Sequence, residues 1–380
     1  MINVLYVCTD WYETEGSTAS LVNLIHSTHG RVHPIVLLNG HGKVETQLAD
    51  QGVETIVAPF FYLWEKPKRL LTAVRHPSRT TWFRRLTLNN RCCRQVKQQL
   101  GDRKIDIVHS NTSVADVGAA LAKTLHAKHV WHIRESLQQL NIHPYGGMKR
   151  LKRRINQADL RIVISHALLE QWKLNSENTV VLHDAVVREL PEPSHEARQK
   201  QILFCAAELN DFKGAPLAVE AFCKSKLVDC QLVMIGNYTE SYHNKLIAIA
   251  EAYGMSDHLH FLGYRSDIEA YYRSAAAFLM CSKFEGLGRV TLEAMAYGCP
   301  VLALATGGTT DFVHHGQTGW LFHTMEECAA TLQQVVQSDV SEVVQAARQL
   351  IADEYTESTY GQQIISLYQS LMSSCHASLS

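Results

Sequence analysis

Two glutamates flank a glycine-rich turn in the stretch FEGLGRVTLEAMAYGCP, which occupies residues 284–300. Glu285 precedes the turn, and Glu293 follows after seven intervening residues. Glycines in such a turn let backbone amides approach a ligand closely, and a helix that begins there suits a phosphate or diphosphate. Carboxylates repel phosphate, so the two glutamates must serve another part of the ligand. Ionised carboxylates accept hydrogen bonds from sugar hydroxyls, which favours a nucleotide sugar. A surface loop with a capped helix remains the alternative for this stretch alone.

Four other stretches place polar or glycine residues directly after apolar, strand-like runs. They are Gly16-Ser17 in TEGSTASLVNLI, His132 and Arg134 in WHIRES, Lys213-Gly214 in ELNDFKG, and Gly307-Gly308 in ALATGGTTDF. Lys213 is a mobile cation that suits a leaving diphosphate, and the glycines allow amides to face a ligand. Each stretch is weak by itself, because surface lysines are common and most of the 20 histidines should be satisfied polar residues.

The elements that must position these residues follow from the hydrophobic pattern. Short apolar runs alternate with amphipathic stretches, which predicts βαβ units and parallel sheets. The expected strands are 2–8, 33–39, 53–59, 105–110, 128–133, 160–165, 178–183, 201–206, 230–236, 258–263, 276–282 and 300–305. Parallel α/β sheets bind ligands outside the carboxyl ends of their strands, where all of the stretches above are expected to lie.

The predicted fold class is α/β, with two Rossmann-like parallel-sheet domains facing each other across a cleft. A segment rich in proline and charge, RELPEPSHEARQKQ, indicates an interdomain linker. We expect an acceptor-side domain at 1–187, a linker at 188–200, a nucleotide-sugar-binding domain at 201–357, and a C-terminal helix at 358–380 that packs back toward the first domain.

Taken together, these stretches resemble the retaining glycosyltransferases of family 4, the glycosyl transferases group 1, which have the GT-B architecture. The resemblance covers nearly the whole chain and is strongest over residues 261–322. The motifs of the family fall on Glu285 and Glu293, Lys213-Gly214, Gly307-Gly308, Gly16 and His132.

The resemblance implies a hexosyl- or glycosyltransferase with Glu285, His132 and Lys213 as catalytic residues. Glu285 would contact donor sugar hydroxyls, Glu293 the ribose, Lys213 and the amides of the 286–289 turn the diphosphate, and His132 the transferred sugar. The implied donor-binding set is Gly16, Ser17, Lys213, Arg265, Gly286, Leu287, Gly288, Arg289 and Glu293, with Arg134, Glu208, Gly307 and Gly308 as further candidates. No cofactor is expected, and the donor substrate would foremost be a UDP-sugar. No metal is expected either, because the chain lacks the Asp-x-Asp metal motif.

Three positions depart from the pattern of the family. Glu208 stands five residues before Lys213, where an arginine is usual, so the diphosphate site loses a cation and gains an anion unless Arg289 or Arg134 compensates. Gly16-Ser17 replaces Gly-Gly, and Asp184-Ala185 replaces Asn-Gly. Glu208 keeps a second hypothesis open, namely a non-catalytic member that binds a nucleotide or scaffolds a glycan assembly complex.

Other enzyme classes fit the sequence less well. A glycoside hydrolase also uses two carboxylates but needs neither Lys213 nor the glycine turns. A nicotinamide enzyme would carry GxGxxG, and both GLGRVT and GHGKVE lack the third glycine. A non-hydrolysing sugar epimerase could share the architecture, but the glutamate pair fits it less well.

Composition and charge indicate where the protein works. The ten cysteines form no CxxC pair, and MINVLYVC indicates a first strand rather than a signal peptide, so we expect a cytoplasmic protein. Residues 1–190 contain 25 Lys and Arg against 16 Asp and Glu, whereas residues 191–380 contain 11 against 21. The basic excess is densest within residues 60–97, where aromatic residues are interleaved, and KRLKRR (149–154) adds to it.

This charge division favours a peripheral position on the anionic inner face of the plasma membrane. A solvated helical face is the alternative, and nucleic acid is disfavoured because no nucleic-acid module is visible. The expected acceptor is a growing glycan or a lipid-linked glycan in cell-surface polysaccharide biosynthesis.

Overall fold

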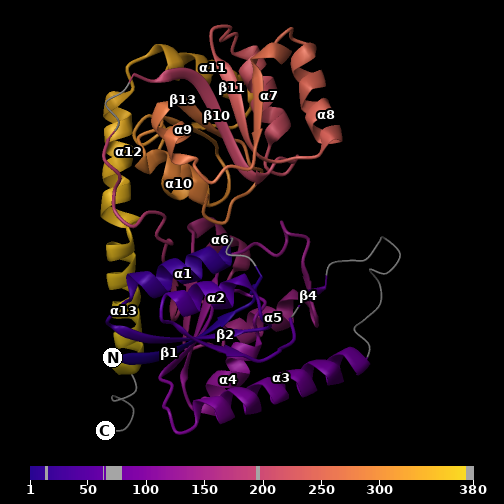
Figure 1. Cartoon of the computed structure of the whole chain (residues 1–380), viewed down its shortest axis with the longest axis vertical. Helices are drawn as coiled ribbons and strands as arrows, with labels where there is room; N and C mark the ends of the chain where they lie inside the picture. The colour runs from indigo at the N-terminus through magenta and orange to yellow at the C-terminus, as the bar shows by residue number, and fades with distance from the viewer. Residues whose placement is uncertain (13–15, 63, 66–78, 194–196, 374–380) are drawn as a thin grey trace. The chain divides into compact units, whose positions relative to one another are not determined.

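The computed structural model describes residues 1–12, 16–62, 64–65, 79–193 and 197–373. It divides the chain into two compact units (Figure 1). The first unit combines Met1–Ala185 with the segment that begins at Glu357, and the second is Val186–Thr356. The expected linker at 188–200 therefore belongs to the second unit.

The first unit is built on a seven-stranded parallel sheet in the order β3-β2-β1-β5-β6-β8-β9. Its strands are β1 (Ile2–Cys8), β2 (Val32–Leu38), β3 (Glu54–Val57), β5 (Ile107–Ser110), β6 (Lys128–Ile133), β8 (Leu160–Val163) and β9 (Thr179–Val181). A separate antiparallel pair joins β4 (Trp64–Glu65) to β7 (His143–Pro144). The short pair was not expected, because two residues are too few to give a hydrophobic pattern.

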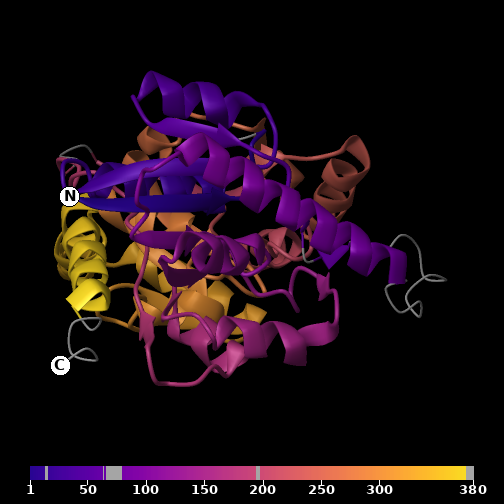
Figure 2. The same ribbon diagram turned by 90° about the horizontal axis from the view of Figure 1, so that it is seen from below.

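Helices cover both faces of this sheet. They are α1 (Ser17–Ser27), α2 (Lys43–Asp50), α3 (Arg79–Leu100), α4 (Val117–Leu125), α5 (Gly147–Ile155), α6 (His166–Trp172) and α13 (Glu357–Ser373). Alternate residues of β1 enter two cores, as the period of a strand requires. Val4 and Tyr6 pack with α1 and α13, whereas Leu5 and Val7 pack with α3 and α4. Figure 2 shows the long helix α3 running along this unit.

The second unit is built on a six-stranded parallel sheet in the order β12-β11-β10-β13-β14-β15. Its strands are β10 (Gln199–Glu208), β11 (Gln231–Asn237), β12 (Leu259–Gly263), β13 (Ala275–Met280), β14 (Val301–Leu304) and β15 (Trp320–Phe322). Its helices are α7 (Ala215–Lys224), α8 (Glu240–Glu251), η1 (Ser256–His258), α9 (Glu269–Ser274), α10 (Arg289–Ala296), η2 (Gly307–Asp311), α11 (Met325–Gln337) and α12 (Ser341–Glu354). Strand β15 was not expected from the sequence.

The strand order of the second sheet is that of a doubly wound, Rossmann-like fold. The order reverses between β10 and β13, and ligands of such sheets bind outside the carboxyl ends of the strands at this point. The loops after these two strands carry Lys213 and Glu285. The topology thus brings together two residues that are far apart in the chain.

None of the helices in the described ranges combines the length and apolar character that a membrane span requires.

Candidate functional site

The central feature of the second unit is an ion pair between Lys213 and Glu285. Lys213 Nζ donates to Glu285 Oε1 over 2.8 Å, and both side chains are partly exposed. The loop that carries Lys213 is fixed locally, because the Lys213 amide donates to Asn210 Oδ1 over 2.9 Å. The sequence placed both charged residues after strands, and the structure shows that they touch.

The turn after Glu285 ends in a helix N-terminus. Gly288 has a φ of 92°, a left-handed conformation that favours glycine, and α10 begins at the next residue. The first amides of a helix have no partner within the helix, so the N-terminus of α10 offers N–H donors and a positive dipole end to an anion. At the other end of α10, Gly298 with a φ of 77° stops the helix as expected.

Glu293 lies on α10, where Arg289 Nη2 is 3.6 Å from its Oε1. Burial raises the pKa of Glu293, the Arg289 charge opposes this rise, and the Glu269 charge adds to it. Glu293 is therefore a half-buried hydrogen-bond acceptor. It lies about one helical turn after the start of α10 at Arg289.

The double glycine, Gly307-Gly308, packs against the backbone of Glu285. The Gly308 amide donates to the Glu285 carbonyl oxygen over 2.8 Å. A Cβ at Gly307 would lie 2.5 Å from that same oxygen, so only glycine fits there. Gly308 was expected to turn its amide toward a ligand. The amide instead holds the backbone of Glu285, because the loop after β14 packs directly against the loop after β13.

Glu208 and Arg265, two further expected residues of the second unit, have no described contact with this pair. Glu208 is exposed at the end of β10 and forms no ion pair among the described residues. Arg265 follows the edge strand β12 and donates to both carboxylate oxygens of Asp267, over 2.8 and 2.5 Å. No described contact joins Arg265 to Lys213 or Glu285.

In the first unit, Gly16 and Ser17 open α1 as expected. Gly16 has a φ of 52° and is exposed, and the Ser17 carbonyl accepts from Asn111 Nδ2 over 2.7 Å. The turn is thus anchored to the loop after β5, while residues 13–15 lie outside the described ranges.

His132, at the end of β6, is fully buried rather than open to solvent. Arg134 Nη2 lies 3.1 Å from His132 Nδ1, and a guanidinium can only donate. Nδ1 therefore accepts, and the ring proton is on Nε2. Burial and the Arg134 charge hold the pKa of His132 well below its ordinary value, so the ring is neutral. His132 thus presents an Nε2–H donor, which has no partner among the described residues.

A chain of hydrogen bonds connects His132 to the C-terminal helix α13 through His109. His109 Nε2 lies 3.2 Å from His132 Nδ1, and His109 Nδ1 lies 2.7 Å from the Tyr368 hydroxyl. Since His132 Nδ1 accepts, His109 donates through Nε2 and accepts from Tyr368 at Nδ1. Sequence reasoning missed Tyr368, because nothing in a helix 236 residues further on (368 − 132) marks it as a partner of this strand.

Arg134 is committed to other protein groups. Its guanidinium forms a buried ion pair with Asp184, and its Nε donates to Asn111 Oδ1 over 3.1 Å. Tyr360 on α13 donates to Asp184 Oδ1 over 3.2 Å. Asp184, one of the departures from the family pattern, is therefore the counter-ion of Arg134. The expected role of Arg134 as a substitute cation for the diphosphate does not fit this arrangement.

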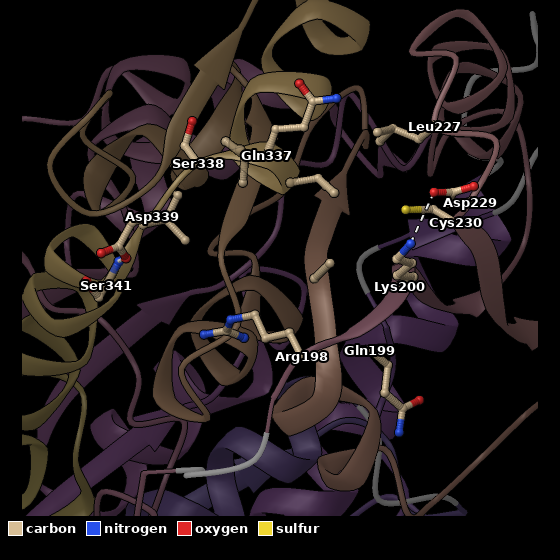
Figure 3. A pocket seen from close by; sticks show the side chains of 14 residues that line it. Arg198, Gln199, Lys200, Leu227, Asp229, Cys230, Gln337, Ser338, Asp339 and Ser341 are labelled. Carbon is tan, nitrogen blue, oxygen red and sulfur yellow. Dashed lines mark hydrogen bonds and ion pairs between the residues drawn. The ribbon is translucent and has the colours of Figure 1, made fainter.

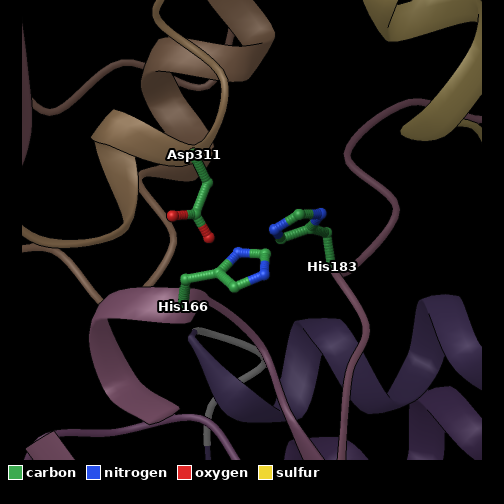
Figure 4. Close-up of side chains that lie close together, drawn as sticks. All are labelled: His166, His183 and Asp311. Carbon is green, nitrogen blue, oxygen red and sulfur yellow. The ribbon is translucent and has the colours of Figure 1, made fainter. Parts of the chain in front are cut away.

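The basic segment is only partly described. Residues 63 and 66–78 lie outside the described ranges. Arg85 was expected on a basic face, but it is buried in an ion pair with Asp116, which also pairs with Arg154. Arg91 and Arg94 are exposed. Two other histidines, His166 and His183, lie close together in the first unit, with ring centroids 6.3 Å apart (Figure 4).

A pocket of about 590 Å³ opens at the amino-terminal edge of the second sheet (Figure 3). Its two cations are already engaged. Lys200 pairs with Asp229 over 3.1 Å, and Arg198 donates to the carbonyl oxygens of Ala275 and Gly298. Because ligands of such sheets bind at the opposite edge, we assign no donor site to it.

Comparisons with known proteins agree with this architecture. The family model described as "Glycosyl transferases group 1" matches residues 186–353, and the model described as "Glycosyltransferase Family 4" matches residues 44–187. Together the two models match residues 44–353, so the chain belongs to the group 1, family 4-like glycosyltransferases that they describe.

Two curated relatives illustrate the sequence likeness. N-acetyl-alpha-D-glucosaminyl L-malate synthase of Bacillus anthracis is 25% identical over 222 residues, which is 55% of this chain and 54% of that protein. The lipopolysaccharide core biosynthesis mannosyltransferase LpsB of Rhizobium meliloti is 25% identical over 219 residues, which is 49% of this chain and 62% of that protein. The chain thus spans about half the length of the curated relatives it matches.

Solved structures share the whole fold. HepE of Anabaena in complex with UDP has a TM-score of 0.75 at 18% identity, over 97% of this chain and 100% of that chain. Sucrose-phosphate synthase of Thermosynechococcus elongatus has a TM-score of 0.75 at 17% identity, over 98% and 100%. Both show that the chain has the two-sheet GT-B fold.

Proposed function

We propose that this protein is a retaining glycosyltransferase that moves a sugar from a nucleoside-diphosphate sugar to a hydroxyl of a glycan or lipid-linked acceptor. The observation that carries the proposal is the 2.8 Å ion pair between Lys213 and Glu285 beside the N-terminus of α10. It combines a cation, helix amides and a carboxylate at the point where the strand order reverses. A diphosphate linked to a sugar needs all three.

Each group takes one part of the donor. Lys213 and the first amides of α10 hold the diphosphate and stabilise the charge that develops on it as the bond to the sugar breaks. Glu285 accepts hydrogen bonds from sugar hydroxyls near the reacting carbon, and Glu293 accepts those of the ribose. A UDP-sugar is the first donor to test, a choice supported by the UDP bound to HepE.

The neutral His132 acts as a donor in this proposal. The resemblance gives its Nε2–H to an oxygen of the transferred sugar, a contact that requires the fully buried ring to become accessible, while Arg134 and His109 fix the tautomer. Positioning and charge stabilisation then supply the acceleration, and the leaving diphosphate takes the acceptor proton. We propose that no metal is needed, since Lys213 and the α10 amides perform the task of a cation.

Glu208 supports a second candidate, a member of the family that binds a nucleotide without turnover. It is an exposed anion at the end of β10, on the strand that leads to Lys213. This candidate predicts nucleotide binding with no sugar released from any donor.

The setting proposed is cell-surface polysaccharide biosynthesis at the inner face of the plasma membrane. The exposed Arg91 and Arg94 and the basic helix α5 support contact with an anionic surface. The lipopolysaccharide mannosyltransferase among the relatives supports the pathway class.

A thermal-shift panel of UDP, GDP, ADP, TDP and CMP, each with and without EDTA, tests the proposal. Selective binding raises Tm by mass action, so one nucleoside diphosphate should raise it equally in both conditions. A shift that EDTA abolishes would refute the metal-free site. No shift with any nucleotide would refute the donor site as built from Lys213 and α10.

A further inference from the structure

A second pocket, of about 410 Å³, lies in the first unit next to the end of β6. The loop after β6, helix α5 and the end of α6 line it. The Trp172 indole N–H donates to the Glu135 carbonyl over 3.0 Å, which ties the pocket wall to the residue two positions after β6. The pocket therefore shares its backbone support with the strand that carries His132.

Lys152 provides an unpaired cation on the wall of this pocket. Among the residues whose side chains are described, no carboxylate lies within ion-pair distance of Lys152. Burial, together with the charge of Lys173, lowers the pKa of Lys152. A bound anion would relieve both effects, because it would compensate a charge that burial and a like charge now disfavour.

A second polar group is also left without a partner. Gln171 lines the pocket, and its Oε1 is inaccessible to solvent and accepts no hydrogen bond within the described residues. A carbonyl oxygen only accepts, so it cannot bond to a phosphate oxygen, and the group of Gln171 that a phosphate can use is its Nε2 amide, which only donates.

The rest of the wall combines the polar side chains of Gln138, Asn141 and His143 with an apolar part. Leu137, Ile142, Met148 and Trp172 supply the apolar part, and Leu137 and Trp172 are each 2% exposed. A volume of 410 Å³ is within the range of pockets that hold drug-sized ligands, far more than a bare phosphate needs. Met148 and Lys152 are four residues apart on α5, so they lie on one face of the helix and place an apolar surface beside the cation.

The charge of α5 also selects an anion. Its sequence, GMKRLKRRI, contains five Lys and Arg and no Asp or Glu. Arg154 is used in the ion pair with Asp116, whereas Lys149 and Arg153 are exposed. The helix thus places positive potential on one side of the pocket, which attracts anions and repels cations.

We propose that this pocket binds a phosphate ester carried on an apolar chain, namely the phosphate end of a lipid-linked acceptor. The phosphate would pair with Lys152 and accept a hydrogen bond from the Gln171 Nε2 amide, and the chain would cover the apolar part of the wall. The assignment as acceptor rests on the proposed function, whereas the binding of an apolar phosphate does not. A phospholipid of the membrane has the same chemistry, and the experiment separates these two sources.

The test uses calorimetry of the full-length protein with decyl phosphate, below the concentration at which it forms micelles. Inorganic phosphate and decanol are the two partial ligands. The variant is Lys152→Met, and Lys149→Met is the matched control, since it removes the same charge from an exposed position on the same helix. Nucleoside diphosphate binding by both variants reports separately on the donor site.

We expect decyl phosphate to bind, and Lys152→Met to weaken its binding at least about tenfold while Lys149→Met changes it by less than about twofold. Inorganic phosphate and decanol should each bind much more weakly. Equal losses in the two variants, or inorganic phosphate binding as tightly as decyl phosphate, would overturn the proposal. Sedimentation with phosphatidylglycerol vesicles should respond equally to both variants. A selective loss with Lys152→Met there would assign the pocket to a membrane lipid and overturn the acceptor.

Discussion

Lys213 Nζ lies 2.8 Å from Glu285 Oε1, although 71 residues separate them in the chain (285 − 213 − 1). We expect Lys213 to hold the diphosphate and Glu285 to hold the sugar, and these two side chains contact each other directly. Asn210 fixes the first loop and Gly308 fixes the second. The geometry of the site thus depends on three loops, each of which follows a neighbouring strand of the sheet.

Replacing Glu208 with arginine should strengthen nucleoside diphosphate binding. The change removes an exposed anion at the end of β10 and restores the cation that the family usually has there. We expect roughly a tenfold gain in affinity by calorimetry, which corresponds to one charge-assisted hydrogen bond. The control is Glu240→Arg, at an exposed position on α8, which should leave the affinity unchanged. An equal gain in both variants would show that only bulk charge is involved.

Gly307→Ala should reduce turnover much more than Gly254→Ala. Both glycines have positive φ values, 61° and 67°, so both substitutions carry similar backbone strain. Only at Gly307 would the new Cβ meet the Glu285 carbonyl, at 2.5 Å, and so displace the Glu285 turn. Steady-state kinetics with matched melting temperatures would separate the two effects. Similar turnover in the two variants would remove the role that we give to Gly307.

The ion pair between Arg134 and Asp184 should be essential for the stability of the first unit. Asp184→Ala leaves a buried guanidinium without its counter-ion, which costs about 3–5 kcal/mol of unfolding free energy. The double variant Arg134→Met with Asp184→Leu removes both charges and should be more stable than Asp184→Ala. Urea denaturation measures both. If the double variant were the less stable one, the cost would arise from packing rather than from the charge.

Nucleotide affinity should fall as the pH decreases, because the Glu293 carboxylate becomes protonated. The ribose hydroxyls need the ionised carboxylate, and burial raises the pKa of Glu293 above its usual 4.5. Protonation therefore occurs at a higher pH than for an exposed glutamate, and affinity is lost as the pH falls through this raised value. Glu293→Gln cannot titrate, so the difference between the pH profiles of the two proteins isolates this residue. Parallel profiles would contradict the assignment.

Local sequence signals predicted the strands and the residues that follow them. All twelve expected strands are present, with ends that differ by at most two residues. Continuous apolar runs and glycine turns are local features, so Lys213, Glu285 and the start of α10 could be found without the structure. Strand β15 has only three residues and gives no usable pattern.

Contacts over long sequence distances could not be predicted. The relay from Tyr368 to His109 and the ion pair between Arg134 and Asp184 depend on which elements pack together, which a hydrophobic pattern does not specify. The amide of Gly308 illustrates the same limit. Its position after a strand was predictable, but whether it faces a ligand or a neighbouring loop depends on tertiary packing.

The most direct test of the account measures sugar release from a panel of nucleotide sugars in EDTA, with water as the acceptor. The wild-type protein should release nucleoside diphosphate from one donor class. Glu285→Gln should slow this release at least about a hundredfold, while binding of the diphosphate changes by less than about threefold. Equal rates in the two proteins would contradict the role of Glu285. Tight nucleotide binding without any release by the wild-type protein would establish the non-catalytic alternative instead.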